Sequence, residues 1–474
     1  MSETTEIKKK EKKGLDISAK SFITAIAVIF VLMIATYGLT FVIPGGQYAR
    51  TVDDAGNTVI DMAGGYTQVE GGIPLWKWAL SPFLVLTAEG SGTMLAVIAF
   101  LLVIGGVFNS LDKCGLMKYM LDRIVSRFGK RRYLLLAVVS FFFMSLGAFI
   151  GSFEECVPLV PIVVALSISL GWDEITGLCM SLMATGCGFA SGVCNPFTVG
   201  VAQKIAGLPM FSGMWFRLIG YALIYGLLLL FTILHAKRVA RPIDPSVLSG
   251  EVKKDPRMTG ALVAFAAIIG AGIAFVLSSG FVPALQDYTM IIVAVMFLIA
   301  GIVCPIIVRM GAKKHIGSFF AGLVSILPAV LMILMAGSIK YTLEEAKILD
   351  PILHYAVTAA QTMPRWAVIL FIYGLVLLME FFIASGSAKA ILLMPLILPI
   401  ASVLGISPQL CIVAFAFGDG FSNVFYPTNA ALLISLGLVD VSYGKWVRST
   451  WKFQLFNLIL TSGLLLLGLA IGYR

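Results

Sequence analysis

The chain has 474 residues, of which 59% are hydrophobic and only 12% are charged. Soluble domains carry roughly twice that share of charged residues, so the composition excludes an ordinary soluble protein. A membrane β-barrel is excluded because its strict alternation of polar and apolar residues is missing. The net charge of +9 comes from Lys and Arg clusters. Such clusters usually mark the cytoplasmic loops of membrane proteins, so we expect a lipid bilayer and no nucleic acid as partner.

Long apolar runs predict an all-α, polytopic membrane protein. A helix needs about 20 apolar residues to cross ~30 Å of hydrocarbon, and five runs reach or approach this length. They cover residues 22–43, 92–108, 218–234, 258–277 and 453–471. The first run follows a basic tail, residues 1–19, which lacks a small-residue cleavage site and is therefore expected to stay in the cytoplasm.

The charges of the loops predict the orientation of the chain. Residues 113–132 contain seven Lys or Arg and one Asp, and the segments 235–258 and 309–315 are also basic. We expect these three segments in the cytoplasm. The acidic segment 45–81 and the balanced segment 340–365 are then expected outside, as is the C-terminus. The predicted location is a bacterial inner or plasma membrane.

The two halves of the chain share ordered motifs. FIGS at 149–152 corresponds to FIAS at 382–385, and Ser191 and Pro196 correspond to Ser422 and Pro427. The motif Gly-x-Trp-x-Arg ends each series, at 213–217 and at 444–448. Ordered matches at a nearly constant offset indicate an internal repeat. The first FIxS follows a basic loop and the second a neutral one, which predicts inverted topology.

This repeat sets the predicted domain boundaries. Repeat 1 covers residues 20–236, a cytoplasmic linker covers 237–257, and repeat 2 covers 258–474. Each repeat is expected to hold a re-entrant hairpin, at about 143–168 and 376–402, and a broken helix, at about 178–206 and 410–437. Broken backbone is tolerated at membrane depth only when it is buried in protein or lines a cavity. The four interruptions therefore predict one central polar site.

The polar side chains of these interruptions are the candidate ligands for substrate and ion. Their oxygens suit an alkali cation or an ammonium group, and the set lacks the His or Cys clusters of a transition-metal site. No metal and no cofactor is expected beyond a coupling Na⁺ or H⁺, with Na⁺ placed near Ser152, Asn195, Ser385 and Asn429. The candidate residues are Ser152, Glu154, Glu155, Ser191, Asn195, Thr198, Ser385, Ser387, Lys389, Asp419, Ser422, Asn423, Thr428 and Asn429.

Adjacent Glu154 and Glu155 stand inside an apolar tract and admit two interpretations. Ser152 and Glu155 have the spacing of a capping box. That role explains only one carboxylate, and an ionisable residue at membrane depth is a functional candidate by default. Our hypothesis is that Glu154 or Glu155 binds a cationic substrate group or a coupling proton.

The other charged candidates also leave alternatives open. Lys389 could hold a substrate carboxylate, neutralise Glu154, or extend to the membrane interface. Asp419 could coordinate an ion or simply end a helix. Asn195 and Asn429 could bind a ligand or repair the proline kinks beside them. Arg217 and Arg448, each shortly after a Trp, are expected to anchor the protein at the interface.

The stretches GSFEECVPLVPI, ASGVCNPFTVGVAQKIAGLP and SGxWFR resemble the YfcC group of the C4-dicarboxylate anaerobic carrier (DcuC-like) family, within the ion transporter superfamily. The resemblance extends over nearly the whole chain. It implies two inverted repeats, an elevator motion of a transport domain against a scaffold, and a homodimer. Proteins of the YfcC group carry the name of basic amino acid antiporters, and some relatives move dicarboxylates. The hairpin tips here differ from the Ser-Asn-Thr motifs of the superfamily.

These observations predict a secondary active transporter rather than an enzyme. The acids Glu154, Glu155 and Asp419 outnumber Lys389, which favours a basic or zwitterionic amino acid such as arginine or ornithine. A sodium- or proton-coupled carrier of C4-dicarboxylates is the alternative. A channel or an intramembrane enzyme is a remote one, because paired hairpins and broken helices suit alternating access.

Overall fold

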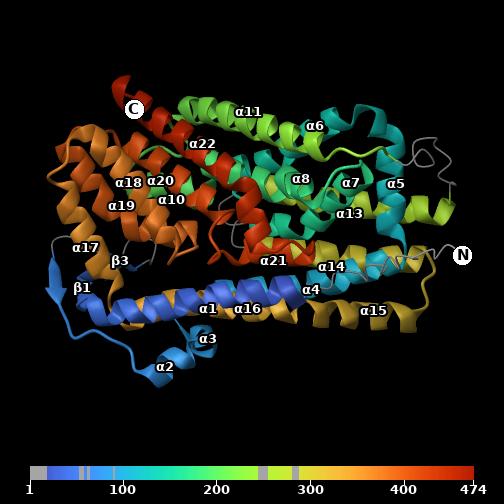
Figure 1. Ribbon diagram of the computed structural model, residues 1–474, viewed down its shortest axis with the longest axis horizontal. Helices are drawn as coiled ribbons and strands as arrows, with labels where there is room; N and C mark the ends of the chain where they lie inside the picture. Colours follow the sequence, from blue (N-terminus) through green and yellow to red (C-terminus); the bar gives the residue numbers. More distant parts are fainter. Residues whose placement is uncertain (1–18, 53–57, 61–63, 89–90, 244–254, 280–287) are drawn as a thin grey trace, which may run out of the picture.

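The computed structural model describes residues 19–52, 58–60, 64–88, 91–243, 255–279 and 288–474, and the molecule is mostly helical (Figure 1). The predicted basic tail (1–19) falls almost wholly outside the described residues. Most of the predicted linker (237–257) does so as well.

The prediction of a multi-pass helical membrane protein is confirmed. By length and composition, seven helical segments of the described chain could cross a bilayer: Met94–Lys113, Leu116–Ile150, Glu174–Ile205, Met214–Val239, Ala312–Glu345, Gly386–Val403 and Tyr443–Ala470. The five predicted apolar runs fall in α1 (Ala19–Val42), α4 (Ser91–Lys113), α11 (Met214–Val239), α13 (Pro256–Ser279) and α22 (Tyr443–Ala470).

The expectation of an all-helical chain is wrong in one segment. β1 (Gly46–Tyr48) pairs antiparallel with β4 (Tyr66–Gln68), and β2 (Arg50–Val52) with β3 (Thr58–Ile60). The short helices α2 (Leu75–Ala79) and α3 (Ser81–Leu84) and a 3₁₀ turn at Val85–Thr87 follow. Three-residue strands carry too little alternation to be recognised in a sequence.

Asp350 fixes this small unit to α17 (Leu349–Ala360). The backbone N–H of Tyr48 donates to its Oδ2 at 2.9 Å, and Arg50 pairs with its Oδ1 at 3.1 Å. The strands therefore hold the helix that precedes α18 (Arg365–Glu380).

Long apolar helices form one layer along the length of the molecule (Figure 1). Here α4 packs against α14 (Thr289–Ile307) and α15 (Ala312–Ser325), α13 packs against α14, and α1 packs against α16 (Leu327–Glu345). Close approach of α4 and α15 depends on Gly322, since a Cβ there would lie 2.2 Å from the Gly105 carbonyl oxygen.

A pair of helices joined by a non-helical tip lies at each of the two segments predicted as hairpins, and we call these pairs the first and the second hairpin. That they are re-entrant stays a prediction. In the first, α6 (Arg132–Ser145), preceded by a 3₁₀ turn at Gly129–Arg131, continues through a π-helical turn at Leu146–Ile150. After the tip, a 3₁₀ helix at Glu154–Leu159 leads into α7 (Val160–Ser169). In the second, α18 (Arg365–Glu380) and α19 (Gly386–Val403) flank the tip. Gly151 sits at φ 76°, a left-handed conformation that lets the first hairpin turn sharply.

Two interrupted helices follow the hairpins. The first comprises α8 (Glu174–Leu178), a π-helical turn at Cys179–Met183 and α9 (Ala184–Ser191). Beyond its break come a π-helical turn at Pro196–Gly200 and α10 (Val201–Ile205). The second comprises α20 (Pro408–Asn423) and, after its break, α21 (Ala430–Leu438). We call residues 192–195 break 1 and residues 424–429 break 2; α9 and α20 touch at Gly420, where a Cβ would lie 2.1 Å from the Ala190 nitrogen.

The predicted loop classes lie at opposite ends of the molecule (Figure 1). α5 (Leu116–Phe128) and α15, which belong to the basic segments, lie toward one end of the long axis, whereas β1, α17 and the C-terminus lie toward the other. This separation is what the loop charges require. Which end faces the cytoplasm stays a prediction, as do the inverted repeats and their boundaries.

Candidate functional site

The tips of both hairpins contact the first interrupted helix, the first tip at break 1 and the second at the π-helical turn that follows it. A Cβ on Gly151 would lie 2.3 Å from Asn195 Oδ1, so the first tip is in direct contact with this break. In the second tip, a Cβ on Gly386 would lie 2.7 Å from Thr198 Cγ2 and 2.9 Å from Asp419 Oδ2. These glycines have no side chain, and the backbone can therefore approach the polar groups closely.

A second contact joins the same elements. The Ser387 hydroxyl donates to the Phe197 carbonyl at 3.0 Å. The rings of Phe381 and Tyr426, from the second hairpin and break 2, lie 4.1 Å apart. The structure thus brings together chain interruptions that are far apart in the sequence.

Three buried ionic side chains stand at this junction. The ammonium of Lys389 pairs with Glu380, and also with Asp419 Oδ1 at 2.5 Å. All three side chains are at most 1% exposed. We call Glu380, Lys389 and Asp419 the charged cluster; with two carboxylates and one ammonium it holds an excess of one carboxylate when all three groups are ionised.

Lys389 therefore does not extend to the membrane interface, and its ion-pair partners are Glu380 and Asp419 instead of Glu154. From the sequence, Glu380 is expected only as a buried partner for a Lys or Arg, with no role in the site, and its ion pair with Lys389 agrees with that expectation. A signal was available, because Glu380 is a lone carboxylate within the apolar run 366–384, and such residues usually have a partner or a function.

Glu154 and Glu155 are half-buried at the first hairpin tip. As like charges, the carboxylates of Glu154 and Asp419 repel each other, and so do those of Glu155 and Glu154. The predicted capping box is wrong: the 3₁₀ helix starts after Phe153, and no side-chain hydrogen bond caps it in the described chain. The turn geometry differs from a normal α-helix start, so Ser152 and Glu155 lack the required positions.

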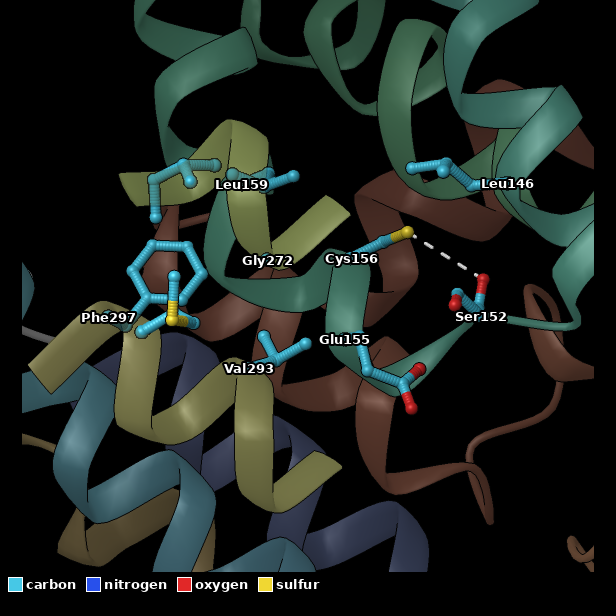
Figure 2. A pocket seen from close by; sticks show the side chains of 10 residues that line it. Leu146, Ser152, Glu155, Cys156, Leu159, Gly272, Val293 and Phe297 are labelled. Atoms are coloured by element: carbon cyan, nitrogen blue, oxygen red, sulfur yellow. Dashed lines mark hydrogen bonds between the residues drawn. The ribbon is translucent and has the colours of Figure 1, made fainter. Parts of the chain in front are cut away.

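Glu155 also borders a partly open cavity between the first hairpin and the helices α13 and α14. Figure 2 shows Ser152 and Glu155 on one side of this cavity and Val293 and Phe297 on the other. Its remaining lining is apolar apart from Cys156. The two adjacent glutamates thus occupy different surroundings.

Asn195, Ser385 and Asn429 all begin helices. The side-chain oxygen of Asn195 accepts from the Phe197 backbone N–H at 2.9 Å, and that of Asn429 accepts from Leu432 at 3.1 Å. Ser385 accepts from Ala388 at 3.4 Å. Each cap satisfies a backbone donor that the break leaves free. The kink-repair interpretation of the two asparagines is therefore correct for their oxygens.

Other predicted ligands bond within their own segment. The Ser191 hydroxyl donates to Cys187 O, and the Ser422 hydroxyl to Gly418 O. Asn423 donates to Asp419 O at 3.0 Å and accepts from Asn429 Nδ2 at 2.6 Å. These groups shape the two interrupted helices.

Outside the charged cluster, three side-chain atoms of the predicted ligands are buried without a hydrogen-bond partner among the described residues: Asn195 Nδ2, Thr198 Oγ1 and Thr428 Oγ1. Asn195 and Thr198 are fully buried. Buried polar groups normally have partners, so these atoms are the groups best placed to receive a ligand.

The sequence matches the family described as DcuC, C4-dicarboxylate anaerobic carrier, over residues 22–470. The chain belongs to this family. The predicted DcuC-like and YfcC-like resemblance is confirmed, and the family is one of transporters.

Relatives of this DcuC-family chain include a protein of Escherichia coli K12 named "Putative basic amino acid antiporter YfcC". It is 30% identical over 391 residues, which are 77% of this chain and 76% of the relative. An uncharacterized protein of Haemophilus influenzae is 23% identical over 489 residues, covering 90% of this chain and 93% of its own. The crystal structure of the YdaH transporter of Alcanivorax borkumensis aligns with 19% identity and a TM-score of 0.44, covering 95% and 99%.

The Gly-x-Trp-x-Arg motifs of this DcuC-family chain donate hydrogen bonds to backbone carbonyls in the helix breaks. Arg217 is 1% exposed, and its Nε donates to the Val193 carbonyl at 3.2 Å. Trp446 is fully buried, and its Nε1 donates to the Val424 carbonyl at 2.8 Å. Val193 and Val424 each stand two residues after the matched serines, Ser191 and Ser422.

In each half a different residue of the motif donates to the corresponding carbonyl, Arg217 in the first half and Trp446 in the second. The other members, Trp215 and Arg448, are exposed. The prediction of interfacial anchoring is therefore wrong for Arg217. A broken helix leaves carbonyls without intrahelical donors, and a buried carbonyl needs a replacement.

Replacing Trp446 with Phe should lower the free energy of unfolding by about 1–3 kcal/mol, since the Val424 carbonyl would be left buried without its donor. The matched variant Trp215→Phe, at the corresponding position and 51% exposed, should change it by less than about 0.5 kcal/mol. Thermal unfolding of the detergent-purified variants measures both. Equal losses in the two variants would show that the indole N–H of Trp446 does not hold break 2.

Proposed function

We propose that this DcuC-family protein is a secondary active transporter of basic or zwitterionic amino acids, such as arginine, lysine or ornithine. The observation that carries the proposal is the excess of buried acid: Glu380 and Asp419 face one ammonium, and Glu154 lies close enough to interact with Asp419. Uncompensated carboxylates are costly at membrane depth, and a cationic ligand would offset that cost. The name of the Escherichia coli relative supports the same substrate class.

The unpartnered donors complete the recognition of an amino acid. Asn195 Nδ2 is buried beside the first hairpin tip and Thr198 Oγ1 beside the second, and both can donate to a carboxylate. The acids would receive the ammonium or guanidinium end. A site that holds both hydrogen-bond donors and acids fits a zwitterion better than a dianion.

Transport of C4-dicarboxylates is the second candidate, favoured by the description of the family. It would require Lys389 or helix N-termini to hold two carboxylates. Lys389 is already paired with Glu380 and Asp419, and the surplus acid repels a dianion. The geometry therefore ranks this candidate second.

For the mechanism, we propose alternating access by an elevator motion. The hairpins and broken helices would form the transport domain, and the layer of α1, α4 and α13–α16 would form the scaffold of a homodimer. The cavity between the first hairpin and α13 and α14 lies at the proposed boundary between these parts. We also propose an inner-membrane orientation with the basic end in the cytoplasm, and coupling or exchange in place of catalysis.

Counterflow in proteoliposomes tests the function. Vesicles loaded with unlabelled arginine should take up external labelled arginine transiently above its equilibrium level, and uptake should saturate. Succinate-loaded vesicles with labelled succinate provide the comparison, and empty liposomes provide the control. Counterflow of succinate without that of any basic amino acid would overturn the proposed substrate class, and non-saturable flux would indicate a channel.

A further inference from the structure

We propose that the ammonium group of Lys389 is a built-in cation that occupies a sodium site, so that the protein works without Na⁺ and gains a Na⁺ site when the lysine is removed. The inference deepens the proposed function. It rests on that function only where it links this site to transport. The occupancy of the site by the ammonium rests on geometry alone.

The position of Lys389 is unfavourable for a cation in two ways. It lies four residues after Ser385, the residue that caps α19, and is therefore near the positive end of the helix dipole. It is also fully buried, and burying an ammonium group carries a large desolvation cost. Glu380 and Asp419 offset both effects, from α18 and α20.

Apolar side chains of similar volume often replace a buried ion pair without loss of stability. Stability therefore gives little reason for a lysine with two carboxylates at the junction of a hairpin tip and an interrupted helix. A fixed positive charge at this place has a direct use, since it keeps the second tip closed on α20 without an ion from solution.

The groups around the ammonium are those that an alkali cation requires. Oxygens of Glu380 and Asp419 contact the ammonium. The Thr198 hydroxyl is buried and has no hydrogen-bond partner in the described chain. Thr198 and Asp419 Oδ2 both lie next to Gly386. Carboxylate and hydroxyl oxygens are hard ligands, which suit Na⁺ and not a soft transition metal. Among the described residues, no group of three His, Cys, Asp or Glu side chains forms a metal site.

Thermal unfolding of the full chain in detergent tests the proposal, with NaCl, KCl and choline chloride compared at equal ionic strength. The wild type should unfold at the same temperature in all three salts. Lys389→Ala removes the ammonium and leaves room for an ion, so its unfolding temperature should rise with Na⁺ alone, in a saturable manner. The second variant, Lys389→Ala with Asp419→Asn, should lose this response.

Lys340→Ala is the matched control, because Lys340 pairs with Glu344 at 3.3 Å but is 36% exposed; this variant should show no preference among the salts. A Na⁺-specific rise in the wild type would overturn the proposal, as would an equal response of Lys389→Ala to all three salts. Should Lys389→Ala fail to fold, wild-type counterflow decides: equal rates with Na⁺ and choline support the built-in cation, and a requirement for Na⁺ refutes it.

The two proposals fail separately. A Na⁺ response confined to Lys389→Ala, together with no transport of any basic amino acid, would leave the built-in cation standing and remove the proposed substrate. Arginine counterflow that depends on Na⁺ would support the proposed substrate and refute the built-in cation.

Discussion

Replacing Lys389 with methionine is expected to lower the free energy of unfolding by about 3–5 kcal/mol in Na⁺-free buffer, because removing one partner of a buried ion pair leaves the others uncompensated. Here two carboxylates, of Glu380 and Asp419, would lose their counter-charge in a site that is at most 1% exposed. Thermal or denaturant unfolding of the purified protein measures the loss.

A second substitution should recover much of this stability. Adding Asp419→Asn to Lys389→Met removes one uncompensated charge and returns the cluster to the net charge of the wild type. The matched control Lys340→Met removes a partly exposed lysine from its pair with Glu344 and should cost less than about 1 kcal/mol. A loss in Lys389→Met no larger than in Lys340→Met would contradict the ion pairs at the centre of the site.

Glu154→Gln is expected to reduce arginine counterflow at least tenfold, which corresponds to about 1.4 kcal/mol of lost interaction. The carboxylate of Glu154 interacts with Asp419 and adds to the surplus negative charge of the charged cluster. The substitution keeps the size of the side chain and removes only the charge. The loss should appear mainly in the substrate concentration needed for half-maximal uptake.

Glu155→Gln is the matched neighbour and should retain most of the transport. Its side chain borders the cavity against α13 and α14, and it interacts with Glu154 rather than with the charged cluster. Concentration series of labelled arginine, repeated at several pH values, compare the variants. Unchanged uptake and pH dependence in both would refute a role for either glutamate in substrate or proton binding.

The two halves of the chain use different residues of the same motif to bond the carbonyls at their helix breaks. The motif Gly-x-Trp-x-Arg appears in both, but Arg217 holds the carbonyl of Val193 and Trp446 holds that of Val424. The shared sequence motif therefore predicts where a side chain donates to a backbone carbonyl at a helix break. It does not predict which side chain of the motif is the donor.

Local sequence patterns were enough to determine the class of this protein. Length and apolarity predicted the membrane helices, because a span needs only a continuous run of residues that avoid water. Proline, serine and asparagine inside such runs predicted both hairpin tips and both helix breaks, since these residues disrupt or cap a helix through their own backbone. The motifs around residues 147–217 were sufficient for the family.

The partners of the charged groups were decided only by the tertiary structure. Lys389 could pair with Glu154 as far as the sequence was concerned, but packing of α18, α19 and α20 places Glu380 and Asp419 around it. The same holds for Arg217, predicted at the interface and found buried. An ion pair depends on the distance between side chains from separate helices, and in a buried site even a small shift changes which charges compensate each other. That distance is set by how the helices pack, and the pattern along any one of them does not contain it.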